Sequence, residues 1–240
     1  MIDSTQTHAR LGRLAWATAW FALLFGQLHA MARHQTVDGR EDLRSGLVRA
    51  WSDPGRRLFR PLLDWASPDT VYLTYGKVWL FVFLVFTLAA FVVHQRRVVA
   101  GAVHGAERWA WRVALTAYSL ATLAVGLEYW TQWGAMDNDL LDTIFLLTMP
   151  ALLLTVLSTT FLGIVLVRRG LGLPAWLLTL QIPLMIGISA VTSLGNVVLP
   201  ICFAFGILGR RVASGDEDEA AVTRRTAGTP IQRTTGAPGR

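Results

Sequence analysis

The sequence is poor in charged residues. Only 16% of its 240 residues are charged, against roughly 25% in an ordinary soluble domain. Hydrophobic residues make up 53%, and the mean hydropathy is +0.43. A disordered chain has few apolar residues, and a soluble nucleic-acid binder carries a broad basic surface. The composition excludes both classes and predicts a polytopic membrane protein.

Cysteine and lysine are almost missing. Cys202 is the only cysteine, so no disulfide can form within the chain. Lys77 is the only lysine among 22 basic residues, a preference for arginine that is typical of GC-rich bacterial genomes. No zinc-type Cys/His pattern, P-loop or G-x-S-x-G motif occurs. We therefore expect no cofactor and no metal site.

The net charge of +6 and the pI near 10.4 need an explanation. In a soluble protein they would indicate an anionic partner. Here most basic residues fall in the loops and the tail, outside the apolar runs. We therefore expect contact with the lipid bilayer and none with nucleic acid.

Long apolar runs predict the spans. A membrane-spanning helix needs about 20 mostly apolar residues, and the chain offers six such runs, near 14–31, 78–93, 113–130, 144–167, 174–192 and 196–209. The last two divide one long apolar stretch at Ser193-Leu194-Gly195-Asn196. We expect an all-α transmembrane bundle of six spans, with five as the alternative.

Arginine distribution predicts the orientation. With a cytoplasmic N-terminus, six spans place most loop arginines inside, as the positive-inside rule requires. The exception is the loop 32–76, which would lie outside the cell membrane. Residues 1–32 also resemble a cleavable signal peptide, but in a multi-span protein we expect the first run to stay as an uncleaved anchor. The transmembrane domain covers 1–211, and the Gly-, Thr- and Arg-rich segment 212–240 is expected to be a disordered cytoplasmic tail.

The 32–76 loop contains two amphipathic patterns. They lie on either side of Asp53-Pro54-Gly55, a typical helix break. Their apolar positions are Leu43, Leu47 and Trp51, and then Leu58, Leu62 and Trp65. We expect two short helices, either packed on their own bundle or docked to a membrane-protein partner through residues 42–66. The partner-binding candidates are Trp51, Leu58 and Trp65.

Polar groups inside spans are expensive and are therefore candidates for function. They gather at the outer ends of the spans, where the ligand-binding candidates are His29, Lys77, Glu128, Tyr129, Asp139 and Asp142. One interpretation is structural, with Lys77 and Glu128 forming an ion pair. The other is an outward-facing pocket with Glu128 as its floor and His29 and Asp142 as partners. Glu128 and Asp142 are the catalytic candidates.

Three functions remain open. The first is a non-catalytic accessory, sensor or assembly partner that uses the 32–76 loop. The second is a membrane-embedded enzyme on a lipid or isoprenoid substrate, with Glu128 as acid or base. The third is a permease subunit, which a mid-bilayer charge or an inverted repeat would favour, and the sequence offers neither. The missing catalytic motifs favour the first.

Overall fold

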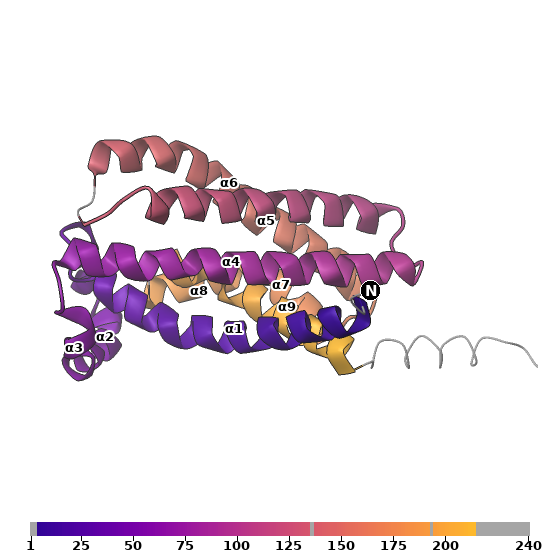
Figure 1. The fold of residues 1–240 in the computed structure, drawn as a ribbon, viewed down its shortest axis with the longest axis horizontal. Coiled ribbons are helices and arrows are strands. Elements are labelled where there is room, and N and C mark those ends of the chain that lie inside the picture. The colour runs from indigo at the N-terminus through magenta and orange to yellow at the C-terminus, as the bar shows by residue number, and fades with distance from the viewer. Residues whose placement is uncertain (1–3, 135–136, 193, 215–240) are drawn as a thin grey trace, which may run out of the picture.

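The computed structural model describes residues 4–134, 137–192 and 194–214, and Figure 1 shows their arrangement. Within these ranges all regular structure is helical and no strand occurs. The expected all-α class is confirmed. The helices form an elongated bundle, with short helices α2 and α3 at one end and the N-terminus at the other (Figure 1).

Four long helices build the bundle. They are α1 (Ser4–Arg33), α4 (Pro68–Val99), α5 (Ala106–Trp130) and α6 (Asn138–Arg168). Within the described residues, these are the four helices that are individually long and apolar enough to cross a membrane. Each extends beyond its apolar run, because the polar residues that flank the run continue the helix.

Local sequence sets where two of these helices begin. The Ser67 hydroxyl caps α4 by accepting a hydrogen bond from the Thr70 backbone N–H at 3.3 Å, and Pro68 occupies the first helical position. The Asp137 carboxylate caps α6 in the same way through the Leu140 N–H, at 3.1 Å. Both caps satisfy backbone donors that have no partner within the helix.

The expected fifth run is a bent pair of helices. α7 (Leu173–Thr179) and α8 (Gln181–Val191) meet at an angle of 70°. Pro183 lacks the N–H that would bond to the Thr179 carbonyl, so the helix is weakest at this point. The pair is compatible with one further crossing of a membrane by length and composition.

The last described segment is η2 (Leu194–Val198) followed by α9 (Leu199–Ser214). The expected break before Asn196 is therefore present. Gly12 of α1 and Gly209 of α9 let the two backbones touch, since a Cβ at either position would overlap the other helix. α9 extends into the segment expected to be disordered, and residues 215–240 lie outside the described part.

A cap of short helices covers the end of the bundle where α1 ends. We use "the cap" for residues 34–67, which contain η1 (Asp38–Arg44), α2 (Gly46–Leu58) and α3 (Arg60–Leu63). The expected break at 53–55 is wrong, because α2 continues through Pro54 to Leu58.

The helix survives Pro54 because the proline removes only one hydrogen bond, the one to the Ala50 carbonyl. The last turn of α2, which follows Pro54, keeps its backbone hydrogen bond. The Phe59 N–H donates to the Gly55 carbonyl at 2.8 Å. Arg56 also forms an ion pair with Asp53 at 2.6 Å.

The inner face of α2 also differs from the expected one. Val48 and Ser52 are buried, whereas Leu47 is 57% exposed. The Trp51 indole donates a hydrogen bond to the Val191 carbonyl at the end of α8. Trp51 therefore belongs to the fold and is not available as a docking residue. Leu58 and Trp65 remain exposed, at 73% and 51%.

Candidate functional site

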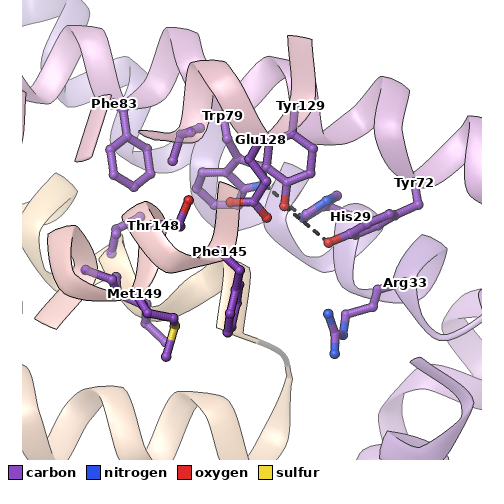
Figure 2. A pocket seen from close by; sticks show the side chains of 14 residues that line it. His29, Arg33, Tyr72, Trp79, Phe83, Glu128, Tyr129, Phe145, Thr148 and Met149 are labelled. Carbon is purple, nitrogen blue, oxygen red and sulfur yellow. Dashed lines mark hydrogen bonds between the residues drawn. The ribbon is translucent and has the colours of Figure 1, made fainter. Parts of the chain in front are cut away.

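A cavity of about 130 Å³ lies between α1, α4, α5, α6 and η2. Figure 2 shows the side chains that line it. One part of the wall is apolar and consists of Phe83, Val125, Phe145, Met149, Leu152, Val197 and Val198. The other part is polar or aromatic and consists of His29, Arg33, Tyr72, Trp79, Glu128, Tyr129 and Thr148. The cavity thus has an amphipathic lining.

His29 is fixed within the polar part. The Trp79 indole Nε1 donates a 2.9 Å hydrogen bond to Nδ1 of His29, and the Tyr72 ring stacks on the imidazole with centroids 4.9 Å apart. Because Nδ1 accepts, the ring proton of the neutral imidazole is on Nε2. Nε2 is buried and has no hydrogen-bond partner, so His29 offers an unused donor.

Two tyrosines complete this side of the cavity. The hydroxyls of Tyr72 and Tyr129 lie 3.2 Å apart and share a hydrogen bond, drawn as a dashed line in Figure 2. Tyr129 packs against the backbone of α4 at Gly76, where any side chain would overlap its ring. Gly76 therefore allows the α5 tyrosine to reach its partner on α4.

Glu128, Thr148 and Arg33 supply the remaining polar groups. The Glu128 carboxylate and the Thr148 hydroxyl point into the same space in Figure 2, and Thr148 Oγ1 is buried without a partner. Arg33 lines the cavity at the end of α1, where its Nε donates to the Asp42 carboxylate of η1 at 3.2 Å. The cavity therefore joins one carboxyl, one guanidinium and two unused polar atoms.

The η2 wall is fixed by two buried amides. Asn196 Nδ2 donates to the Gly26 carbonyl of α1 at 3.3 Å, and Gln181 Nε2 donates to the Val197 carbonyl at 2.7 Å. Both residues are fully buried. These bonds hold Val197 and Val198 in the cavity wall although η2 is only five residues long.

The structure brings three of the expected site residues together: His29, Glu128 and Tyr129 all line the cavity. Lys77 does not line it. The Lys77 ammonium lies 3.2 Å above the ring centre of Trp133, and the expected pair with Glu128 is wrong. The cavity face of α4 carries Tyr72, Gly76 and Trp79, and Lys77 is rotated about 100° from Gly76.

Asp139 and Asp142 also lie outside the cavity, and both are exposed. Asp142 precedes the first cavity residue of α6, Phe145, by about one helical turn, and Asp139 precedes it by nearly two. Asp142 therefore has no place as a partner of Glu128. Arg33 and Thr148 are polar groups of the same cavity wall, and the sequence offered no signal for Thr148, which resembles an ordinary packing residue.

A buried carboxylate that the sequence patterns did not indicate lies at the opposite end of the bundle. Glu107 is fully buried, with Arg97 Nε 2.7 Å from Oε1 and Arg169 Nε 3.2 Å from Oε2. The Trp111 indole also donates to Oε1, at 3.3 Å. This cluster joins the ends of α4, α5 and α6. Glu107 is paired with both arginines, so the cluster can hold these three helix ends together.

No three His, Cys, Asp or Glu side chains in the described part of the chain gather closely enough to hold a metal ion. The groups that the cavity offers to a ligand are its hydrogen-bonding side chains and its apolar wall. No known protein family, no curated protein and no solved structure matches this chain.

Proposed function

We propose that this chain is a multi-span membrane protein that binds one small amphiphilic ligand in the cavity and acts as a non-catalytic accessory or sensor protein. The observation that carries the proposal is the pair of unused polar atoms, His29 Nε2 and Thr148 Oγ1. A buried polar group without a partner costs about 1–3 kcal/mol. A ligand that bonds to both atoms would recover that free energy.

The wall chemistry indicates the class of ligand. A head group with an acceptor oxygen suits the His29 donor, and a hydroxyl suits the Glu128 carboxylate. A cavity of about 130 Å³ holds such a head group but not a long tail. Phe145 and Met149 are 46% and 42% exposed, so this wall is partly open and a tail can leave between the helices. The proposed ligand is a lipid- or isoprenoid-like amphiphile.

The proposal includes six membrane crossings. α9 has 16 residues and η2 has five, and together they extend about 34 Å at 1.5 and 2.0 Å per residue. That length suits a hydrocarbon core of about 30 Å. α9 returns along α1 and ends beside the N-terminus (Figure 1). We propose that both termini are cytoplasmic and that the cap faces outside the cell membrane.

Cysteine labelling tests this topology. In a Cys202→Ser background, a membrane-impermeant maleimide added to intact cells should label Val37→Cys, whose parent side chain is 78% exposed. It should not label Gly101→Cys or Ser214→Cys until the cells are opened. Labelling of Ser214→Cys in intact cells, with Gly101→Cys still protected, would contradict the sixth crossing.

Native mass spectrometry of the full chain tests ligand binding. The wild type, purified gently from membranes, should retain one small amphiphile. Glu128→Gln should retain much less, because it loses the acceptor charge in the cavity. Asp142→Asn is the matched control, since this exposed carboxyl lies outside the cavity. Equal retention by all three proteins, or none by the wild type, would reject the proposal.

Catalysis is the second candidate. Glu128 is the only carboxyl among the residues found to line the cavity, and a positioned carboxyl can act as a general acid or base. If the protein is an enzyme, the retained amphiphile should be converted in membranes that contain the wild type. Glu128→Gln should block conversion, whereas a binding protein leaves the amphiphile unchanged.

An accessory role also needs a partner, and we propose the exposed part of the cap as its surface. Leu58 and Trp65 lie there, while Trp51 is bonded within the fold. A photo-crosslinking residue at position 58 should give one discrete adduct in intact cells. The same residue at Leu24, which is also 73% exposed but lies in α1, should give none. Identical products at both positions would contradict a specific surface.

A further inference from the structure

The cap contains a second pocket, separate from the membrane cavity. Its volume is about 470 Å³. Its polar lining comes from the end of α1, from η1, from α2 and from the segment after α3, and consists of His34, Gln35, Arg40, Arg56 and Asp64. Four segments thus direct polar side chains into one space.

His34 is buried in the wall of this pocket. It is 0% exposed, and neither ring nitrogen completes a hydrogen bond of ordinary geometry. The imidazole faces the backbone of Thr192, and the Trp51 ring lies 6.0 Å away between centroids. A neutral imidazole always carries one N–H. His34 therefore presents a buried polar ring whose hydrogen-bonding capacity is incompletely used.

Arg56 also has unused donors. One terminal nitrogen of its guanidinium bonds to the Asp53 carboxylate at 2.6 Å. Its Nε is buried and has no partner. A guanidinium has five N–H donors in a planar fork, and the Asp53 bond uses only one edge. Arg56 therefore keeps donors that an oxyanion could accept.

The charges around the pocket do not cancel. Three arginine–aspartate pairs are formed, namely Arg33–Asp42, Arg56–Asp53 and Arg60–Asp64. Gln35 also donates to Asp64, at 3.0 Å, so the carboxyl that lines the pocket is already engaged. Arg40 makes no ion pair within the described residues. The lining therefore carries one uncompensated positive charge.

We propose that this pocket binds a phosphate group, with Arg40 and Arg56 as its donors and the His34 ring as part of its wall. Arginine forks match the geometry of phosphate oxygens, and charge-assisted hydrogen bonds are about twice as strong as neutral ones. The source of the phosphate is either a soluble phosphate ester or the head group of a phospholipid. The proposal does not depend on the membrane cavity, because no residue lines both pockets.

Calorimetry on the full chain in a phosphate-free sugar detergent tests the site. The soluble probes are inorganic phosphate and glycerol phosphate. A second arm uses mixed micelles that contain phosphatidylglycerol and counts bound lipids by native mass spectrometry. Saturable binding of a soluble probe, or a fixed stoichiometry of one lipid, is the expected result. Binding in the first arm alone assigns a soluble ester, and binding in the second alone assigns a lipid head group.

Variants decide whether the binding uses this pocket. Arg40→Gln, at an exposed position that the fold does not depend on, should weaken binding about tenfold or more, as the loss of a charge-assisted bond predicts. Arg56→Gln should do the same, and its folding is checked by thermal melting. Arg44→Gln is the control, because Arg44 is paired with Glu41 and its side chain is 81% exposed.

Three results would overturn the proposal. One is the absence of binding in both arms at probe concentrations up to about 10 mM, because a dissociation constant above that value is too weak for a specific site. Another is an equal loss of binding in Arg40→Gln and Arg44→Gln, which would mean that the phosphate binds to the general basic surface of the cap. Unchanged binding in folded Arg40→Gln and Arg56→Gln leads to the same rejection.

Discussion

The Trp79 indole on α4 holds the His29 ring on α1 through a 2.9 Å hydrogen bond to Nδ1. This contact fixes both the position of the imidazole and the nitrogen that keeps its proton. The free Nε2 is then available to the cavity in one orientation. Trp79 is therefore a positioning residue for the proposed ligand site, and its removal should affect binding without a change in cavity charge.

Trp79→Phe should lower both ligand retention and stability. It removes the donor and leaves His29 Nδ1 buried without a partner, which costs about 1–3 kcal/mol. For a chain of this size, each kcal/mol corresponds to about 2–4 °C in the melting temperature. Trp109→Phe serves as the control, because Trp109 is 64% exposed. Equal melting shifts in the two variants would show that the hydrogen bond is not the cause.

Gly76→Ala should destabilise the fold by about 1–3 kcal/mol, the usual range for overpacking a tight contact. The new methyl group overlaps the Tyr129 ring, which must move and break its bond to Tyr72. Gly187→Ala is the matched control in another helix, where a Cβ meets no atom within 4 Å. That change should be neutral or slightly stabilising, since alanine is a better helix former than glycine. Thermal melts in detergent measure both, and a stable Gly76→Ala would contradict the packing.

Glu107→Gln should be more damaging than any surface charge change. It removes the carboxylate charge that pairs with both Arg97 and Arg169, whose side chains are 12% and 37% exposed. Breaking a buried pair costs about 3–5 kcal/mol, and the partial exposure of Arg169 places this case near the lower end.

Glu41→Gln is the control for that change, because Glu41 and Arg44 are both largely exposed. It should shift stability by less than about 1 kcal/mol. High salt should reduce the effect at Glu41 and leave the effect at Glu107 largely intact. A Glu107→Gln protein that melts like the wild type would show that the cluster does not hold the helix ends together.

The cap should weaken in acid through His34. Burial lowers the pKa of His34, Arg56 and Arg33 act in the same direction, and Asp42 and the Thr192 backbone oppose them. The unfolded chain therefore takes up a proton first, near pH 6.5. The stability that neutral His34 contributes is complete above that pH and is lost as the pH falls through the folded pKa.

Hydrogen exchange of residues 38–58 measures this loss, after correction for the intrinsic pH dependence of exchange. Between pH 7 and 5, protection should fall in the wild type and stay nearly constant in His34→Gln. His104→Gln, which changes an exposed histidine at the other end of the bundle, should behave like the wild type. A pH-independent wild type would contradict the prediction.

Hydropathy was sufficient to predict the positions of the long helices. The apolar runs near 78–93 and 144–167 lie inside α4 and α6, because an apolar run of this length must satisfy its backbone as a helix in lipid. The break near 193–196 was also predictable, since one straight helix would be too long. Pro183 marks the weak point between α7 and α8 in the sequence, but the 70° angle of the bend could not be predicted from it.

Contacts between helices were much less predictable. A helix that is apolar on all sides has no stripe that indicates which face meets its neighbour. The sequence predicted that Glu128, His29 and Lys77 lie at the same level of the bundle. Lys77 is nevertheless separated from the other two, because it lies on a different face of α4. Glu107 was overlooked for the same reason, since its arginine partners come from two other helix ends.

The contact between Gly12 and Gly209 has a consequence for biogenesis. Among the described helices, the first, α1, packs backbone to backbone against the last, α9. During synthesis, the glycine face of α1 therefore has no partner until α9 has left the ribosome. A chain that stops before α9 would leave the glycine face of α1 without its partner helix. In the membrane, a quality-control protease or a helix of another protein would bind this exposed face. The order of translation thus places the packing of α9 on α1 after the synthesis of all the described helices between them.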